Sequence, residues 1–238
     1  MPEPSLDSWT VVFLLAAAQG IFLSLVFLFK RSDKSATLVN VLVLLFSITL
    51  LDYVAFWTNY RFVLPHLSRI SAAFPFLFGP IFYLYIASYL KKKAISKKDV
   101  WQFIPFLLYT LLQLPFYILS AEDKISILLN RQFLPISDML SQEVLLVIFR
   151  TSNLLVIVHL SIYCLLSFKL ISQADLKNVS REIKQYLNII KYSFLGFVLS
   201  FTSYYVMVYA FSYVRVYDYA ISVAMSLFIY GIGYFSLV

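Results

Sequence analysis

Seven apolar runs of about 20 residues follow one another along this chain, and none of them contains more than one charged residue. Because an α-helix rises 1.5 Å per residue, about 20 residues cross a hydrocarbon core roughly 30 Å thick. The sequence therefore predicts an all-α, polytopic membrane protein with a bundle of seven transmembrane helices. We place the seven spans at residues 9–29, 38–58, 70–90, 101–119, 144–168, 192–213 and 219–238.

Composition supports this class of fold. Hydrophobic residues make up 61% of the 238 residues, and charged residues only 13%. A soluble domain of this length cannot bury so much apolar surface, so the surplus is expected to face lipid. The first run begins at Trp9 without a basic segment before it and is too long for a signal peptide. We therefore expect one transmembrane domain over residues 1–238.

The positions of lysine and arginine predict the orientation in the membrane. Thirteen of the 19 basic residues lie in the connections after the first, third and fifth runs, at 30–34, 91–98 and 169–191. Short loops that are rich in these residues stay in the cytoplasm. The sequence therefore predicts an N-terminus outside and a C-terminus in the cytoplasm. The net charge of +7 is then a signal of topology and gives no support to nucleic-acid binding by these residues.

Two connections are expected to contain helices of their own. Ser120, followed by Glu122 and Asp123, is typical of a helix N-terminus and predicts a short helix on the outer surface. Before the sixth run, apolar residues recur every three or four positions and predict an amphipathic helix. Two interpretations of that helix stay open, a helix packed on the membrane interface and a surface that docks a partner. The apolar positions are Leu176, Val179, Ile183, Leu187 and Ile190.

Motifs of enzymes and cofactor sites are missing from the sequence. It contains no metal-ligand spacing, no glycine-rich phosphate loop and no nucleophile elbow, so we expect neither catalysis nor a cofactor. The seventh run contains no lysine, which excludes a retinal Schiff base there. His159 lies midway along the fifth run, where a neutral histidine bonded to a neighbouring helix is more common than a proton relay.

Two charged residues lie inside apolar runs. Asp52 lies six residues before the end of the second run, and Arg150 lies six residues after the start of the fifth. Both are then roughly 9 Å below the outer boundary, where an unpaired charge is costly. We expect them to pair, directly or through water. The pair could fix helix packing, Arg150 could extend to the headgroups, or the two could sense a ligand.

Aromatic and polar residues at the same depth outline a candidate ligand pocket that opens outward. The alternative is a belt of aromatic residues at the membrane interface. The tentative ligand-binding residues are Asp52, Arg150, Trp57, Asn153, Tyr204 and Tyr205, with Tyr53 and Tyr209 beside them.

Small residues spaced by four predict close helix packing in the first run. Ala16, Gly20 and Ser24 lie on one stripe, and the neighbouring Gln19 can form a hydrogen bond to another helix. The stripe fits packing within the bundle or against a second copy in a homodimer. In the third run, the Gly79–Pro80 pair predicts a kink.

Several short motifs resemble the membrane-embedded N-terminal half of bacterial AraC-type transcriptional regulators, and the likeness spans nearly the whole chain. They are residues 17–20, residues 75–80 with Tyr83 and Tyr85, residues 103–106, and residues 115–117 leading into 120–123. In that family, a region of seven transmembrane helices precedes a cytoplasmic helix-turn-helix domain that binds DNA.

The resemblance implies a one-component sensor in the bacterial inner membrane, in contact with the lipid bilayer and open to an unidentified small-molecule ligand. It would bind DNA only through a C-terminal domain after Val238. Since this sequence stops at Val238 without a polar tail, we expect it to be part of a longer protein. The alternatives are a small transporter or channel and the membrane domain of a sensor histidine kinase.

Overall fold

The computed structural model describes residues 2–29, 34–91, 96–130, 142–175, 180–211 and 219–237. These ranges contain helices and no strand, which confirms the predicted all-α class. The α-helices are α1 (Ser8–Phe29), α2 (Lys34–Trp57), α3 (Pro75–Lys91), α4 (Ile104–Tyr117), α5 (Ala121–Leu129), α6 (Gln142–Gln173), α7 (Arg181–Ala210) and α8 (Tyr219–Leu237). Short 3-10 helices are η1 (Tyr60–Phe62), η2 (Pro65–Leu67) and η3 (Lys97–Phe103).

Each of the seven predicted runs corresponds to a helix, but the helices differ in length. Five segments of the described chain are long and apolar enough to cross a membrane: α1, residues 35–57 of α2, η3 together with α4, residues 150–173 of α6, and α7. The helices α3 and α8 are apolar but shorter. The third run was expected to become helical at Ile70, but residues 68–74 form turns and α3 begins only at Pro75.

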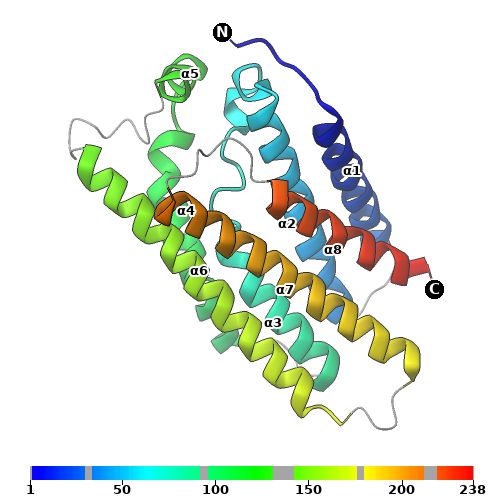
Figure 1. Cartoon of the computed structure of the whole chain (residues 1–238). Helices are drawn as coiled ribbons and strands as arrows, with labels where there is room; N and C mark the ends of the chain where they lie inside the picture. Colours follow the sequence, from blue (N-terminus) through cyan, green and yellow to red (C-terminus); the bar gives the residue numbers. More distant parts are fainter. Residues whose placement is uncertain are drawn as a thin grey trace.

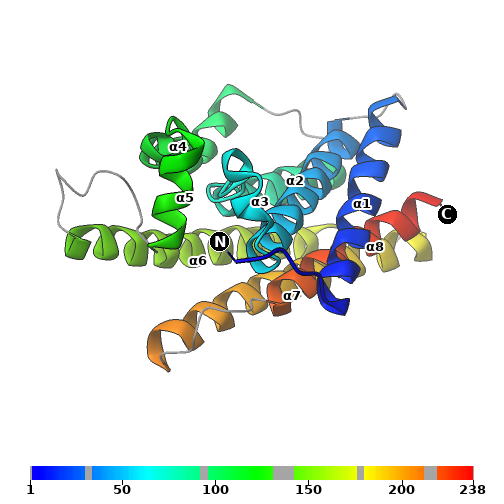
Figure 2. The same ribbon diagram turned by 90° about the horizontal axis from the view of Figure 1, so that it is seen from above.

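Six of the helices form a closed ring. Around this ring α1 packs on α2, α2 on α3, α3 on α6, α6 on α7, α7 on α8, and α8 again on α1 (Figure 1). The helix α4 packs on α3 outside the ring, and Figure 2 shows it on the opposite side of the molecule from α1 and α8. Only Gln113 and Phe116 of α4 are buried, which agrees with its position at the edge.

The centre of the ring is filled by phenylalanine side chains from four helices. Phe82 and Phe194 stack with ring centroids 3.8 Å apart. The Phe46 ring lies 4.7 Å from Phe78 and 5.3 Å from Phe228. All of these rings are almost completely inaccessible to solvent, so the middle of the bundle is closed. We call this set the phenylalanine core: Phe46, Phe78, Phe82, Phe194, Phe197 and Phe228.

The small residues of α1 allow close approach of its neighbours, as the sequence predicts. Ala16, Gly20 and Ser24 are all buried. A Cβ atom on Gly20 would overlap Ser47 Oγ of α2 and lie 3.2 Å from Ile229 of α8. Asn40 Nδ2 donates to the Ser24 carbonyl oxygen at 3.2 Å, which joins α1 and α2 about one turn after Gly20. The stripe therefore packs within the bundle, and its use in a homodimer stays a prediction.

Both expected connecting helices are present where the chain is described. Ser120 caps α5, because its Oγ accepts a hydrogen bond from the Asp123 amide at 3.2 Å. The amphipathic segment does not form a separate helix but continues without a break into α7, in which Leu187 and Ile190 are buried. Of the other expected apolar positions, Ile183 is 38% exposed, and Leu176 and Val179 lie outside the described residues.

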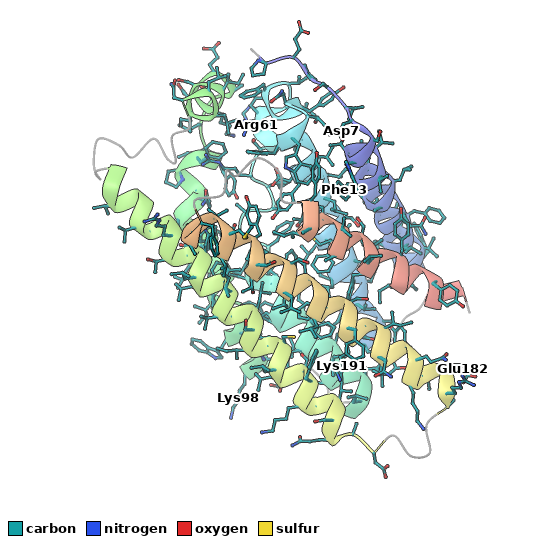
Figure 3. The ribbon with its side chains drawn as sticks, in the orientation of Figure 1. Asp7, Phe13, Arg61, Lys98, Glu182 and Lys191 are labelled. Atoms are coloured by element: carbon teal, nitrogen blue, oxygen red, sulfur yellow. The ribbon has the colours of Figure 1, made fainter. Side chains whose placement is uncertain are left out.

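The two ends of the bundle carry different side chains. Asp7 and Arg61 lie at one end, whereas Lys98, Glu182 and Lys191 lie at the other (Figure 3). We call the first the Asp7 end and the second the lysine end. The Asp7 end also contains the short helices η1, η2 and α5 (Figure 1).

Candidate functional site

The contacts of the predicted pocket residues fall into three groups. In the first, Trp57 packs among aromatic rings of α1, α2 and α8. Its ring centroid lies 4.7 Å from that of Tyr219 and 5.7 Å from that of Phe13, while Tyr53 is 5.8 Å away on α2 itself. This group therefore joins three helices at the Asp7 end. Because Phe13 is 1% exposed, a ligand has little of its side chain to contact.

The second group lies between α6 and α7. Asn153 Nδ2 donates to the Tyr209 hydroxyl at 2.6 Å, and the Arg150 guanidinium lies 5.6 Å from the Tyr209 ring centroid. Tyr205 contacts Tyr209 and Tyr204, with centroids 5.9 and 5.2 Å away. The Arg150 side chain is exposed. This group connects four of the six tentative ligand residues, because Arg150, Asn153 and Tyr205 contact Tyr209 while Tyr204 contacts Tyr205.

The third group surrounds Asp52 and contradicts its expected direct pairing with Arg150. Asp52 accepts hydrogen bonds from the Arg69 amide at 3.2 Å, the Ser71 amide at 3.1 Å and the Ser71 hydroxyl at 2.6 Å. Arg150 contacts Tyr209 instead. The direct pairing was wrong because depth alone was considered, whereas pairing through water stays a prediction. The turn before α3 supplies Asp52 with backbone donors, so the carboxylate does not depend on a distant cation.

Arg69 is the central residue of the turn that Asp52 holds. Its φ of 63° is in the left-handed region, which costs free energy for a residue with a side chain. Three hydrogen bonds to Asp52 from this turn offset that cost. The Arg69 carbonyl oxygen accepts from the Tyr117 hydroxyl of α4 at 2.9 Å, and its guanidinium lies 4.3 Å from the Phe116 ring centroid. The turn thereby attaches α4 to α2.

Lys124 attaches α5 to the same assembly. Its side chain is 2% exposed. Its Nζ donates to the Tyr117 carbonyl oxygen at 2.9 Å, lies 2.9 Å from His66 Nδ1 of η2 and is 5.7 Å from the Phe116 ring centroid. We call the whole assembly the Arg69 network. It comprises Asp52, His66, Arg69, Ser71, Phe116, Tyr117 and Lys124.

Positive charge is concentrated in the Arg69 network. Phe116, which is fully buried, has both the Arg69 guanidinium and the Lys124 ammonium group near its ring. Burial lowers the pKa of Lys124 below the usual lysine value, and it lowers the pKa of the Arg69 guanidinium as well. Among the described residues, Asp52 supplies the carboxylate of this network, and its hydrogen bonds come from the turn before α3.

Asp7 joins the N-terminus of α1 to the start of α8. Its Oδ1 accepts from the Thr10 amide at 2.7 Å and its own amide donates to Thr10 Oγ1 at 3.0 Å, which is a reciprocal helix cap. The Tyr219 hydroxyl donates to Asp7 Oδ2 at 3.0 Å. The hydrogen bond from the Thr10 amide is the main reason why the pKa of Asp7 is lowered.

Among the described residues, His159 has no hydrogen bond to a neighbouring helix, although its position predicts one. Its ring packs against Tyr163 and Phe76, with centroids 4.8 and 5.7 Å away. Its Nδ1 is buried and has no hydrogen-bond partner among the described residues. Within those residues, no three histidine, cysteine, aspartate or glutamate side chains gather closely enough to hold a metal ion.

Comparison with known proteins gives no relative. No family model, no curated protein and no solved structure matches this chain. The resemblance to AraC-type regulators therefore stays a prediction.

Most residues of the Arg69 network were not among the candidate site residues. One signal for Lys124 was available, because Lys124, Ile127 and Leu128 have the spacing of one helical face and all three are buried. A lysine on an apolar face of a short helix predicts a buried cation. No comparable signal marked Arg69 or Ser71, since their contacts depend on how the turn folds back over α2.

Proposed function

We propose that this chain is the membrane-embedded sensor module of a one-component transcriptional regulator in the bacterial inner membrane. A stimulus at the Asp7 end would change the helix arrangement and act on a cytoplasmic helix-turn-helix domain encoded after Val238. The bundle would cross the membrane seven times, with its N-terminus outside and its C-terminus inside. The lysine end would then face the cytoplasm, in agreement with the distribution of basic residues.

Seven spans are compatible with the lengths of the helices. The 17 residues of α3 extend about 25 Å, slightly less than a hydrocarbon core of roughly 30 Å. Neighbouring helices cover α3 along most of its length, since Phe78, Phe82 and Ile86 are almost completely buried. A helix forms its own backbone hydrogen bonds. Where protein covers such a helix, its length does not need to match the thickness of the lipid.

The observation that carries the proposal is the closed phenylalanine core. Transporters bind their substrates near the middle of the bilayer, with polar groups and interrupted helices around the site. Here the middle of the ring contains rings in contact, such as Phe46 with Phe197 at 4.9 Å. The Arg69 network, with Asp52, Arg69 and Lys124, lies toward the Asp7 end instead. This arrangement favours a receptor that rearranges over a channel that conducts.

Two long helices connect the ends of the molecule. The 30 residues of α7 extend about 45 Å and the 32 residues of α6 about 48 Å. Arg150, Asn153 and Tyr209 link the two near the Asp7 end, whereas Lys184 and Lys191 lie on α7 toward the lysine end. A shift of α7 at one end is therefore transmitted along a single continuous helix.

The native gene tests this proposal. The reading frame after the Val238 codon should encode a basic helix-turn-helix domain of roughly 100 residues. Deleting the gene should then change the transcription of a limited set of promoters that the purified domain binds. A frame that continues into a histidine kinase would contradict the proposal, and so would a stop codon combined with solute uptake by vesicles that contain the protein.

A further inference from the structure

The short helix α5 is attached to the rest of the chain at few points. It lies at the Asp7 end (Figure 1). Its apolar face, Ile127 and Leu128, packs on Phe62 and Phe116. Within the described residues, the polar contacts from α5 to other elements come from Lys124, which bonds to the Tyr117 carbonyl oxygen and contacts His66 on η2. Opening of the contact with His66 would leave α5 held by the Lys124 bond to Tyr117 of α4 and by a small apolar patch.

The contact between Lys124 and His66 depends on protonation. Lys124 Nζ lies 2.9 Å from Nδ1 of His66, a distance that requires one of the two nitrogens to act as acceptor. When the lysine is charged, the imidazole has to be neutral, with its proton on Nε2. His66 is exposed, so protons from the solvent reach it. A second proton on the pair would place two cations in contact.

We propose that Lys124 and His66 form a proton-operated latch, which holds α5 on η2 while His66 is neutral and releases it when His66 takes up a proton. The proton enters from solvent and binds Nδ1, which removes the acceptor for the lysine. Both side chains are then cationic and separate, and α5 moves away from η2. The latch goes beyond the proposed regulator, because it works in the same way whatever follows Val238.

The surroundings favour opening once the second proton is bound. The Arg69 guanidinium is on the same Phe116 ring as Lys124, and Arg61 lies over the Phe62 ring at 4.8 Å. The carboxylate of Asp123 accepts a hydrogen bond from Ser120 at 2.6 Å, within the cap of its own helix. Burial also lowers the pKa of Lys124, so the environment already disfavours one positive charge. The titratable and charged groups of the elements around the pair are Asp52, Arg61, Arg69, Tyr117, Glu122 and Asp123.

The latch can be tested by distance measurements on the full chain in detergent or nanodiscs. Spin labels at Val63→Cys and Ser126→Cys, two exposed positions, report the separation of α5 from the η1–η2 region. Cys164 is buried and stays in place. Measurements at about pH 7.5 and about pH 5.0 bracket the range in which imidazoles titrate. We expect one short distance at the higher pH, and a longer, broader distribution at the lower pH.

Two substitutions decide which residue is responsible. His66→Gln keeps an acceptor for Lys124 but cannot be protonated, so it should give the short distance at both pH values. His159→Gln, a change of the other histidine in the chain, is the matched control and should leave the transition unchanged. The latch is refuted if the distance in the unmodified sequence does not depend on pH. It is refuted equally if His66→Gln still shows the transition.

A third variant distinguishes loss of the latch from a folding defect. Lys124→Met removes the cation while filling a similar volume, so protonation of His66 no longer creates repulsion. Its distance should be independent of pH, and circular dichroism should show the helix content of the unmodified sequence. A pH transition that persists in this variant would assign the movement to another group and overturn the proposal.

Discussion

The phenylalanine core and the Arg69 network are held together by different forces. In the core, rings from α2, α3, α7 and α8 pack without hydrogen bonds, and no single contact determines the arrangement. In the network, the loss of one partner leaves a buried polar or charged group unsatisfied. Packing of many equivalent contacts resists change, whereas a few directional contacts between titratable groups respond to protons or ligands. We therefore expect the middle of the molecule to be rigid and a response to arise at the Asp7 end.

The largest effect is expected in the core. Phe82→Ala removes a ring that is fully buried and stacked on Phe194 at 3.8 Å. The cavity should destabilise the bundle by about 3–5 kcal/mol. Chemical unfolding of the purified protein in mild detergent, followed by helix content, measures this loss.

A phenylalanine outside the core is the control for this prediction. Phe22 of α1 is 61% exposed, so Phe22→Ala should change the free energy of unfolding by no more than about 0.5 kcal/mol. Equal effects of the two substitutions would mean that the central rings do not hold the bundle together.

The network should show a smaller, coupled effect. Asp52→Asn weakens hydrogen bonds that Arg69 and Ser71 donate to a carboxylate, at a cost of about 1.5–3 kcal/mol. Because Ser71→Ala removes one of the same bonds, the double variant should lose less than the sum of the two single losses. Unfolding in detergent gives all three values.

The combination of Asp52 with Arg150 is the control for the double variant of Asp52 and Ser71. Arg150 and Asp52 have different partners, so Asp52→Asn combined with Arg150→Leu should be additive within about 0.5 kcal/mol. A larger coupling between these two positions would restore the pairing that their similar depth suggested.

Much of the fold could be predicted from the sequence because its signal is local. Each apolar run carries its own evidence for a helix, and Ser120 followed by Glu122 and Asp123 correctly predicted the cap of α5. The spacing of Ala16, Gly20 and Ser24 correctly predicted a packed stripe. These patterns depend on residues within a few positions of one another.

The candidate site was predicted less well because its contacts are distant in sequence. Asp52 is bonded to residues 69 and 71, and Lys124 lies against His66, 58 positions earlier in the chain. Hydropathy gives the approximate depth of Asp52 and Arg150 but not the direction in which each side chain points. A turn with a left-handed residue at Arg69, which decides the partner of Asp52, left no pattern in the sequence.

The smallest predicted effect concerns Asp7, whose contacts combine local and distant partners. Asp7→Ala removes the α1 cap and the hydrogen bond from Tyr219, at an expected cost of about 1 kcal/mol. The folded-state pKa of Asp7 is lowered from 3.8, mainly by the Thr10 amide. The stabilisation is therefore complete above about pH 3.8 and is lost as the pH falls through the lower folded-state value. Thermal unfolding of the two proteins in detergent should differ at neutral pH and converge in strong acid, while Glu3→Ala, a change of an exposed neighbour, should have no such effect. A difference that stays constant down to the lowest pH would show that the Asp7 carboxylate does not stabilise α1 through its charge.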